Sequence, residues 1–343
     1  MIKSFDEVFE DVTKLGVKIK TDEYHPIGKY QIIDQGQEAV AGYSDLEDGV
    51  FENVPAIVFG DHTRIVKYVD QPFFLGADGV KVLRSRFKDA NYRYLYYALK
   101  SVKIPNTGYN RHFKWLKEAK IYYPNSEEQS KIVLILDEIS SVIEHRQRQL
   151  QKLDELVKAR FVELFGDPEL NPRGLPVLPW NAVFLTTTGK LDSNAMVENG
   201  RYPFFTCAKE SYKIDSYAFD CEALLLAGNN AAGIYDVKHY KGKFNAYQRT
   251  YVLRLMNEKW SYILFKRQLE DKLQYLQSQS KGTNTRYLTL GILNELRFVV
   301  PPVAEQEQFA VFVEQTDKSK VAVQKALDEA QLLFDSLMQK YFG

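Results

Sequence analysis

The sequence predicts an α+β protein in which two globular α/β parts are each followed by one long coiled-coil helix. Three observations lead to this fold. Residues 126–164 contain no Gly or Pro and place an apolar residue on every helical turn. Residues 303–343 repeat that pattern, and short β-prone runs separated by Gly and Asp turns precede each long stretch. The chain is therefore a tandem repeat of one globular part and one helix.

The first long helix is predicted from Ser126 to Leu164. Ser126 follows Pro124 and can cap the helix, while Glu127 and Glu128 place negative charge where the helix dipole favours it. At 1.5 Å per residue this helix is roughly 57 Å long, so its apolar seam needs a partner of similar length. Two arginines in the seam either fix the register as buried polar groups or face outward. The seam, with coiled-coil spacing, is Ile132, Leu136, Ile139, Ile143, Arg146, Leu150, Leu153, Val157, Arg160 and Leu164.

A second copy of the helix supplies that partner. Leu116–Pro124 aligns with Leu293–Pro301, and the alignment continues without a gap to residue 343. Because the two stripes are alike, the two helices can bury each other's apolar face. The second seam is Phe309, Val313, Thr316, Lys320, Val323, Leu327, Ala330, Phe334, Leu337 and Tyr341.

Each globular part is expected to be strand-rich in its middle. A helical stretch follows the strands in each part, at Tyr92–Val102 and at Lys259–Gln279. A polar loop, 104–111 or 280–286, then leads into a short helix or turn and one more strand. The predicted strands are Tyr30–Asp34, Ala56–Phe59, Arg64–Val69 and Val80–Leu83, then Tyr202–Cys207, Ala223–Ala227, Ile234–Val237 and Thr250–Leu255.

These elements divide the chain into four segments. Residues 1–125 form the first globular domain and 126–166 the first long helix. Residues 167–302 form the second globular domain and 303–343 the second long helix. The Pro-, Asn- and Gly-rich stretch Pro168–Pro179 is predicted to be the linker between the two copies.

The composition is that of an ordinary globular protein with material for more than one core. Of 343 residues, 45% are hydrophobic and 26% are charged, and 45 basic against 45 acidic side chains give a net charge of +0. This balance carries no global nucleic-acid signature, although charge can be segregated on a surface. We find no signal segment and no apolar run of membrane-spanning length, so we expect a cytoplasmic protein without membrane contact.

The sequence lacks the motifs that would indicate an enzyme. It contains no phosphate-binding loop, no dinucleotide fingerprint and no tetrapeptide of the adenine-methyltransferase type. The two cysteines, Cys207 and Cys221, and five scattered histidines have no metal-ligand spacing. We therefore predict no catalytic residues, no cofactor and no metal site.

The first candidate binding loop follows an apolar strand in each copy. In the second copy it carries the amides Asn229 and Asn230, and in the first copy it carries His62, Thr63 and Arg64. Amide side chains can bond adenine N6 and N7 together, while Arg suits guanine O6 and N7. The alternative is an ordinary hairpin turn, in which Asn and Gly are common.

The second candidate loop precedes the last strand of each globular part. Gly, small hydroxyls, amides and a cation suit contacts to phosphates and base edges. A basic, aromatic-interleaved segment of the second copy would add affinity for the DNA backbone, although a solvated surface is the simpler interpretation for each lysine. The candidates are Asn106, Tyr109, Asn110 and Arg111 in the first loop copy, Lys281, Thr283, Asn284 and Arg286 in the second, and Lys238, Lys241, Lys243 and Arg249 in the basic segment.

This pattern resembles the DNA specificity subunit of type I restriction-modification systems, and the resemblance covers the whole chain. Its most specific pieces are Lys281–Asn284 with Leu288–Leu293, followed by Val300-Pro301-Pro302-Val303-Ala304-Glu305-Gln306. The first copy keeps Glu128-Gln129 but has Tyr123-Pro124-Asn125-Ser126 in place of the double proline. The chain is also short for the family, with a compact first globular part.

The resemblance implies two target recognition domains joined by an antiparallel helix pair with pseudo-twofold symmetry. Each domain would read half of a bipartite target in double-stranded DNA, and the helices would set the spacer; roughly 57 Å of helix matches about 17 base pairs. Two modification (methyltransferase) subunits that carry S-adenosylmethionine would dock on the chain, and restriction (endonuclease) subunits would join them. The chain itself would be non-catalytic. The alternatives are a structural adaptor that reads no DNA, or a stand-alone DNA-modifying enzyme with an unrecognised site.

Overall fold

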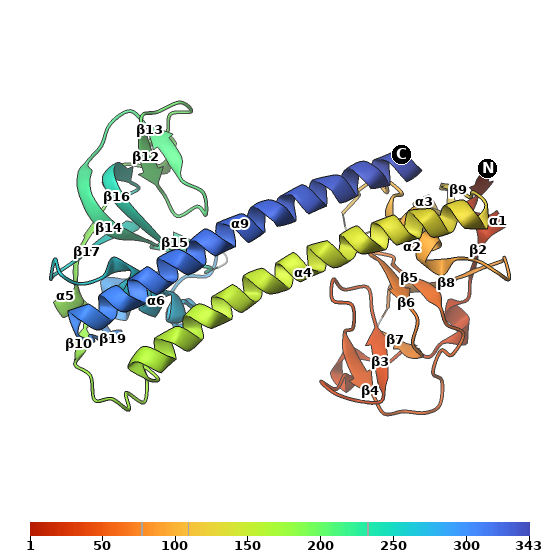
Figure 1. Ribbon diagram of the computed structural model, residues 1–343, viewed down its shortest axis with the longest axis horizontal. Helices are drawn as coiled ribbons and strands as arrows, with labels where there is room; N and C mark the ends of the chain where they lie inside the picture. Colours follow the sequence, from red (N-terminus) through yellow and green to blue (C-terminus); the bar gives the residue numbers. More distant parts are fainter. Residues whose placement is uncertain (77, 109, 232) are drawn as a thin grey trace. The chain divides into compact units, whose positions relative to one another are not determined.

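The computed structural model of the protein describes residues 1–76, 78–108, 110–231 and 233–343. The chain forms two compact units. Unit 1 contains residues 1–147 and 324–343, and unit 2 contains residues 148–323. The long helices α4 (Ser126–Phe165) and α9 (Val303–Phe342) each contribute residues to both units (Figure 1). Both long helices are confirmed, whereas the division into four segments stays a prediction.

Unit 1 contains two small sheets and one short strand pair. The four-stranded antiparallel sheet has the order β2-β8-β5-β6, and the three-stranded sheet has the order β4-β3-β7 with β3 and β7 parallel. Strand β1 pairs antiparallel with β9, just before α4. The strands are β1 Ile2–Ser4, β2 Phe9–Asp11, β3 Tyr30–Ile33, β4 Gly42–Ser44, β5 Ala56–Gly60, β6 Val66–Val69, β7 Phe73–Leu75, β8 Val80–Ser85 and β9 Lys120–Tyr122.

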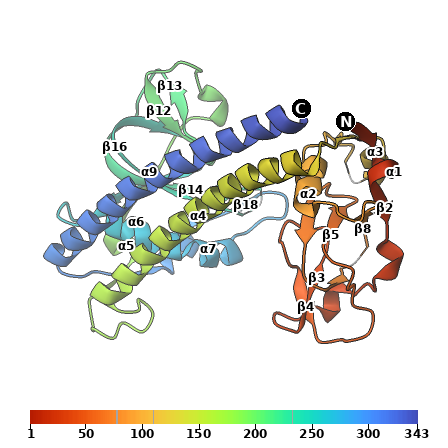
Figure 2. The same ribbon diagram turned by 45° about the vertical axis from the view of Figure 1, so that its right-hand side comes forward.

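Short helices pack against the four-stranded sheet and the β1/β9 pair of unit 1. They are α1 (Phe5–Val8), α2 (Tyr92–Lys100) and α3 (Phe113–Lys117), with 3-10 turns at Thr13–Leu15 and Thr21–Glu23. Asn91 caps α2 by accepting a hydrogen bond from the amide of Tyr94. The apolar face of α2 packs between the β5/β6 side of the sheet and the α4 and α9 segments of this unit (Figure 2). Every residue of β5 is buried, as expected for the centre of a core.

Unit 2 is organised around a single six-stranded sheet with the order β11-β17-β14-β16-β12-β13. The pairs are antiparallel except β12 with β16. Two short antiparallel pairs, β10 with β19 and β15 with β18, lie outside this sheet. The strands are β10 Val177–Pro179, β11 Phe184–Thr188, β12 Tyr202–Phe205, β13 Tyr212–Ile214, β14 Phe219–Ala227, β15 Asn229–Asn230, β16 Val237–Ala246, β17 Thr250–Leu255, β18 Arg286–Tyr287 and β19 Arg297–Val299.

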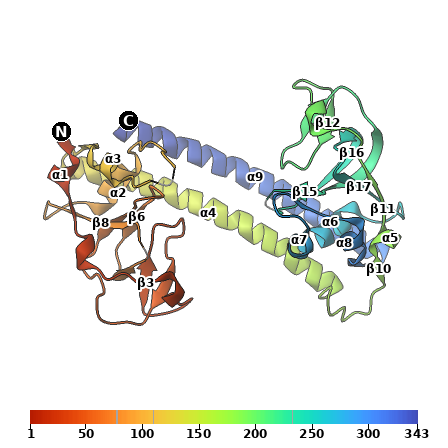
Figure 3. The same ribbon diagram turned by 180° about the vertical axis from the view of Figure 1, so that it is seen from behind.

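The helices of unit 2 follow the order seen in unit 1. They are α5 (Trp180–Val183), α6 (Tyr262–Asp271), α7 (Leu273–Gln279) and α8 (Leu290–Asn294), with a 3-10 turn at Ser193–Ala195 (Figure 3). The first residue of α2 and of α6 is a tyrosine with the same function. Tyr92 accepts a hydrogen bond from the amide of Ser85 at 3.0 Å, and Tyr262 accepts one from the amide of Leu255 at 3.1 Å. This shared order confirms the predicted tandem repeat.

Several predicted boundaries are wrong. The run Ile234–Val237 is not a strand; β16 begins only at Val237 and continues through the basic segment, because its partner β14 is long enough to pair with it. The end of the predicted linker, Val177–Pro179, forms β10 because β19 is free to pair with it. The single helical stretch predicted at Lys259–Gln279 is two helices that meet at Lys272.

In both units the two long helices pair through the predicted seams. Unit 1 joins the early α4 residues Ile132 and Leu136 to the late α9 residue Phe334 in one core. Unit 2 joins late α4 to early α9, with the rings of Phe161 and Phe309 centred 5.7 Å apart. The pairing is therefore antiparallel within each unit, and every seam position is buried or half-buried. None of the helices that the structure describes is both long and apolar enough to span a membrane.

Each long helix begins with a buried glutamine that fixes its start. Gln129 is 4% exposed and Gln306 is 0% exposed. Their side-chain amides donate to the carbonyl oxygens of Pro124 and Pro301, at 2.9 and 2.8 Å. Gln306 also accepts a hydrogen bond from the amide of Ser261, the N-cap of α6, at 3.0 Å. The Glu-Gln motif thus ties the start of α9 to the helix that covers the sheet of unit 2.

Replacing Gln306 with Ala should destabilise the protein by roughly 2–4 kcal/mol, because the half-buried Ser261 amide and the buried Pro301 carbonyl would both lose their partner. Urea unfolding monitored by circular dichroism measures this change. Gln308→Ala, which alters an exposed residue of the same helix, is the matched control and should stay within about 0.5 kcal/mol of the parent. Equal stability of the two variants would contradict a structural function for Gln306.

Candidate nucleic-acid interface

In unit 1 the two predicted loops lie against each other. Asp61 follows β5, is 4% exposed, and accepts a hydrogen bond from the amide of Phe113 at 2.7 Å. The backbone carbonyl of Asp61 also accepts from the amide of the fully buried His112 at 2.8 Å. The His62 imidazole lies 3.1 Å from the carbonyl oxygen of Asn110. These bonds hold Asp61 and His62 beside residues 110–113.

The candidate side chains of unit 1 differ in exposure. Thr63 is exposed, but its hydroxyl donates to the carbonyl of Gln35 at 2.6 Å and thereby positions the turn. His62 and Arg64 are half-buried, and Arg64 has a left-handed backbone with φ of 64°. Exposed side chains on the second loop are Asn106, Asn110 and Arg111, whereas Tyr109 lies outside the described residues.

In unit 2 the two predicted loops form a two-stranded ribbon. Asn229 pairs with Tyr287 and Asn230 with Arg286 as β15 and β18. A bridge between Lys281 and Tyr287, with backbone hydrogen bonds of 3.0 and 2.8 Å, closes the tip of the second loop. The structure therefore brings the two predicted loops together in this unit as well.

Two glycines make the ribbon of unit 2 possible. A side chain at Gly228 would meet the carbonyl oxygen of Arg249 at 2.3 Å, and the amide of Gly228 donates to that same oxygen at 2.9 Å. Gly282 has φ of 100°, and a side chain there would lie 2.2 Å from the carbonyl of Thr285. Only glycine fits such positions without strain. The tip consequently presents exposed side chains, which are Lys281, Thr283 and Asn284.

The three lysines of the basic segment lie on strand β16 of the central sheet, whereas Arg249 lies in the turn before β17. Lys238 pairs with Asp236 and donates to the carbonyl of Ala208 at 2.9 Å, so its charge is partly neutralised. Lys241 is 78% exposed and lies 3.0 Å from Glu222. Burial alone would raise the pKa of Glu222, but hydrogen bonds from Lys241 and His239 outweigh it and hold this pKa below its usual value.

A cluster of rings and cations around Lys243 was missed by the sequence analysis. The Lys243 ammonium lies 4.7 Å from the ring centre of Tyr217, and attraction to the Tyr217 side chain raises the pKa of Lys243. Tyr217 packs at 5.1 Å on Tyr202, and the Arg201 guanidinium lies 5.8 Å from the Tyr202 ring. The sequence gives no local signal for this cluster, because its residues come together from separate strands and turns. Arg249, by contrast, is exposed and lies beside Gly228.

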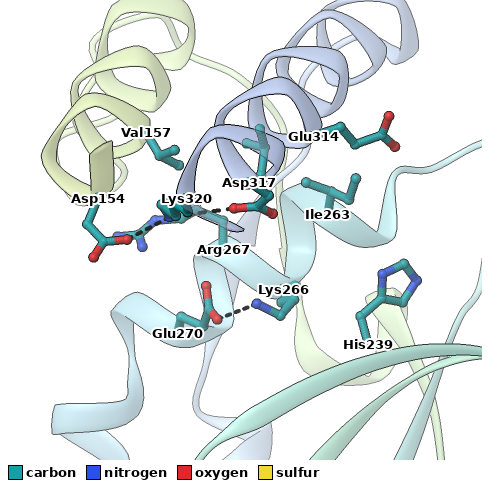
Figure 4. Close-up of a pocket in the computed structure, with 11 residues that line it drawn as sticks. Asp154, Val157, His239, Ile263, Lys266, Arg267, Glu270, Glu314, Asp317 and Lys320 are labelled. Atoms are coloured by element: carbon teal, nitrogen blue, oxygen red, sulfur yellow. Dashed lines mark hydrogen bonds and ion pairs between the residues drawn. The ribbon is translucent and has the colours of Figure 1, made fainter. Parts of the chain in front are cut away.

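A cavity of about 550 Å³ in unit 2 is lined by packed helices and by neither of the candidate loops. It lies between α4, α6 and α9, with His239 of β16 at one side (Figure 4). Lys320 bridges Asp154 at 2.6 Å and Asp317 at 3.5 Å, and Lys266 pairs with Glu270 (Figure 4). The cavity therefore has little unbalanced charge. Among the described residues, no group of three or more His, Cys, Asp or Glu side chains is arranged to hold a metal ion.

The fold defines a class of proteins in which a globular α/β part is duplicated and each copy brings two polar loops together. The chain belongs to the family of type I restriction modification DNA specificity domains, whose family model matches residues 1–155 and 183–330. This confirms the resemblance seen in the sequence. The fold is also that of a type I restriction-modification system S subunit from M. genitalium, which is 18% identical, with a TM-score of 0.66 over 100% of this chain and 96% of the other.

Curated relatives from Escherichia coli match part of the chain. The specificity subunit of the type I restriction enzyme EcoDI is 36% identical over 160 residues, which are 44% of this chain and 35% of that protein. The specificity subunit of EcoR124I/EcoR124II is 26% identical over 147 residues, which are 39% of this chain and 36% of that protein. The matches thus span about a third of the length of these relatives.

Asp61→Ala should loosen the contact between the two loops of unit 1, because the Phe113 amide would lose its acceptor. We expect faster hydrogen exchange at that amide and a loss of about 1–3 kcal/mol of stability. Asp61→Asn keeps a side-chain oxygen at the same place and serves as the control. If the two variants exchange equally fast, the Asp61 side chain does not hold the loops together.

Proposed function

We propose that the protein is the DNA specificity subunit of a type I restriction-modification complex, and that each unit reads one half of a bipartite target in double-stranded DNA. One observation carries this proposal beyond family membership. In both units the same two loops, distant in sequence, lie together and expose amides, hydroxyls and cations. Such groups are those that bond base edges and phosphates.

The contacts divide by chemistry. Amides at Asn110, Asn230 and Asn284 suit adenine edges, and Arg111 suits guanine. Exposed lysines supply attraction to phosphates that does not depend on sequence; they are Lys241, Lys243 and Lys281. Lys238 is engaged within the sheet and contributes least.

The long helices suit the docking of partner subunits. Although their seams are covered, their outer faces expose large apolar residues in both units. In unit 1 these include Leu134 at 71% and Leu332 at 72% exposure, and in unit 2 Val321 at 71%. We propose that two modification subunits bind these faces and supply S-adenosylmethionine and catalysis, and that restriction subunits join the assembly. The chain itself would recognise DNA and catalyse nothing, and α4 with α9 would set the spacer between the half-sites.

Co-expression with the modification subunit encoded nearest its gene should produce a split adenine-methylated motif in host DNA, detected by methylome sequencing. Exchange of residues 168–301 for those of a relative should change one half of that motif and leave the other half unchanged. A stable complex without new methylation would indicate a structural adaptor instead. DNA turnover by the purified chain alone, with Mg²⁺ and S-adenosylmethionine, would indicate a stand-alone enzyme.

Asn284→Ala should reduce methylation at motifs of the second half-site by a factor of about 10 to 100, because one base-reading amide is worth about 1–3 kcal/mol. The measurement is the methylated fraction at each motif variant. Asn294→Ala, an exposed amide of the same unit on α8, is the matched control and should leave methylation unchanged. An unchanged motif and rate for Asn284→Ala would remove this loop tip from the reading surface.

A further inference from the structure

We propose that unit 1 contains a phosphate-binding pocket next to its recognition loops, built on Arg64 and Lys100, and that its ligand is a backbone phosphate of the bound DNA. This inference rests on the proposed function and assigns a site within it. The cavity has a volume of about 400 Å³ and lies between the turn after β5 and the end of α2. Its polar lining residues are Thr63, Arg64, Tyr96 and Lys100, and the others are apolar.

The charge of this cavity is unbalanced. Two of its lining side chains are cations, two carry hydroxyl groups, and none is a carboxylate. Across the described ranges, neither Arg64 nor Lys100 forms an ion pair with an acidic side chain. In the cavity of unit 2, by contrast, Lys266 and Lys320 both face carboxylates (Figure 4). Two uncompensated positive charges in one cavity favour an anionic ligand.

The left-handed backbone conformation of Arg64 indicates that its side chain has a functional role. The turn is closed by hydrogen bonds from the Gly60 amide to the Ile65 carbonyl and from the Arg64 amide to the Gly60 carbonyl, at 2.8 and 2.7 Å. It requires a left-handed residue, and φ is 64° at Arg64. A side chain in this conformation is strained, and Gly would avoid this strain while Asn would reduce it. Strain of this kind is typical of functional sites.

The guanidinium of Arg64 also has an unused donor. Its Nε atom is buried and has no hydrogen-bond partner within the described part of the chain. Buried donors in native proteins are nearly always paired, so an acceptor from a ligand is the simplest way to satisfy this one. A phosphate offers several oxygens in a geometry that guanidinium groups match well.

Lys100 is held in place by rings rather than by an acid. Its ammonium lies 5.6 Å from the ring centre of Tyr96 and 5.3 Å from that of Phe334, and it is 3.4 Å from the Tyr96 hydroxyl. Aromatic faces attract the ammonium but leave its full charge available. The carbonyl end of α2 opposes an anion with roughly half a unit of negative charge. Two full positive charges outweigh this partial charge.

The test uses the complex with the modification subunits and measures DNA affinity at several salt concentrations. Arg64→Asn keeps a residue that tolerates the left-handed turn, and Lys100→Met keeps the apolar stem. Each variant should weaken binding about tenfold for target and non-target DNA alike, because phosphate contacts carry no sequence information. Each should also lower the slope of log affinity against log salt by about one. Lys29→Met, which alters an exposed unit 1 lysine that pairs with Glu47 and lies on neither a long helix nor a candidate loop, is the control and should change neither quantity.

Two other outcomes would overturn the inference. Unchanged affinity and salt slope in both variants would show that no DNA phosphate occupies the cavity. The second outcome comes from calorimetric titration of the full chain with inorganic phosphate. If the variants lose phosphate binding but bind DNA as tightly as the wild-type chain, the ligand of the cavity is a free anion and not a DNA phosphate. Failure of the proposed function is recognisable separately, because the wild-type complex itself would then bind no DNA, and the assignment of a DNA phosphate would fall with it.

Discussion

The antiparallel pairing of α4 with α9 within each unit is the constraint on which the rest of the structure depends. Neither globular part closes its core alone. Unit 1 buries Ile132 and Leu136 of α4 together with Phe334 of α9, and unit 2 buries Phe161 with Phe309. Burying each such side chain contributes roughly 1.5–3 kcal/mol. The long helices thus complete the core of each unit, and the candidate loops are built on these cores.

Much of the fold could be predicted from the sequence, because its main signals are periodic. The seam of each long helix repeats over ten positions, and all of these positions are buried or half-buried. Strand extent was harder to predict. The run Lys238–Phe244 was not assigned to a strand because it is polar, but pairing with β14 makes it one. Strand pairing is a long-range property that local composition does not determine.

The sequence predicted the two candidate loops of each unit, but it did not predict that they lie together on one surface. Because the loops of each unit are far apart in sequence, only the folded chain shows that His62 lies beside Asn110 and that Asn230 pairs with Arg286. The two units achieve this differently, with side-chain bonds from Asp61 in unit 1 and a backbone ribbon in unit 2. Most of these bonds involve backbone atoms, so the outward side chains can vary without loss of the scaffold. That separation suits the proposed function, in which the two units read different half-sites.

Unit 1 is built from two segments that are far apart in the sequence, and this affects the order in which the units can fold during synthesis. Unit 1 contains residues 1–147 and also 324–343, whereas unit 2 is contained entirely within residues 148–323. Domains usually fold as they are synthesised, with the N-terminal one first. Here the N-terminal unit must wait until residues 324–343 have emerged before Phe334 can enter its core. The second unit is thus the first that can fold completely, and nascent unit 1 has an incomplete core until residues 324–343 have been synthesised.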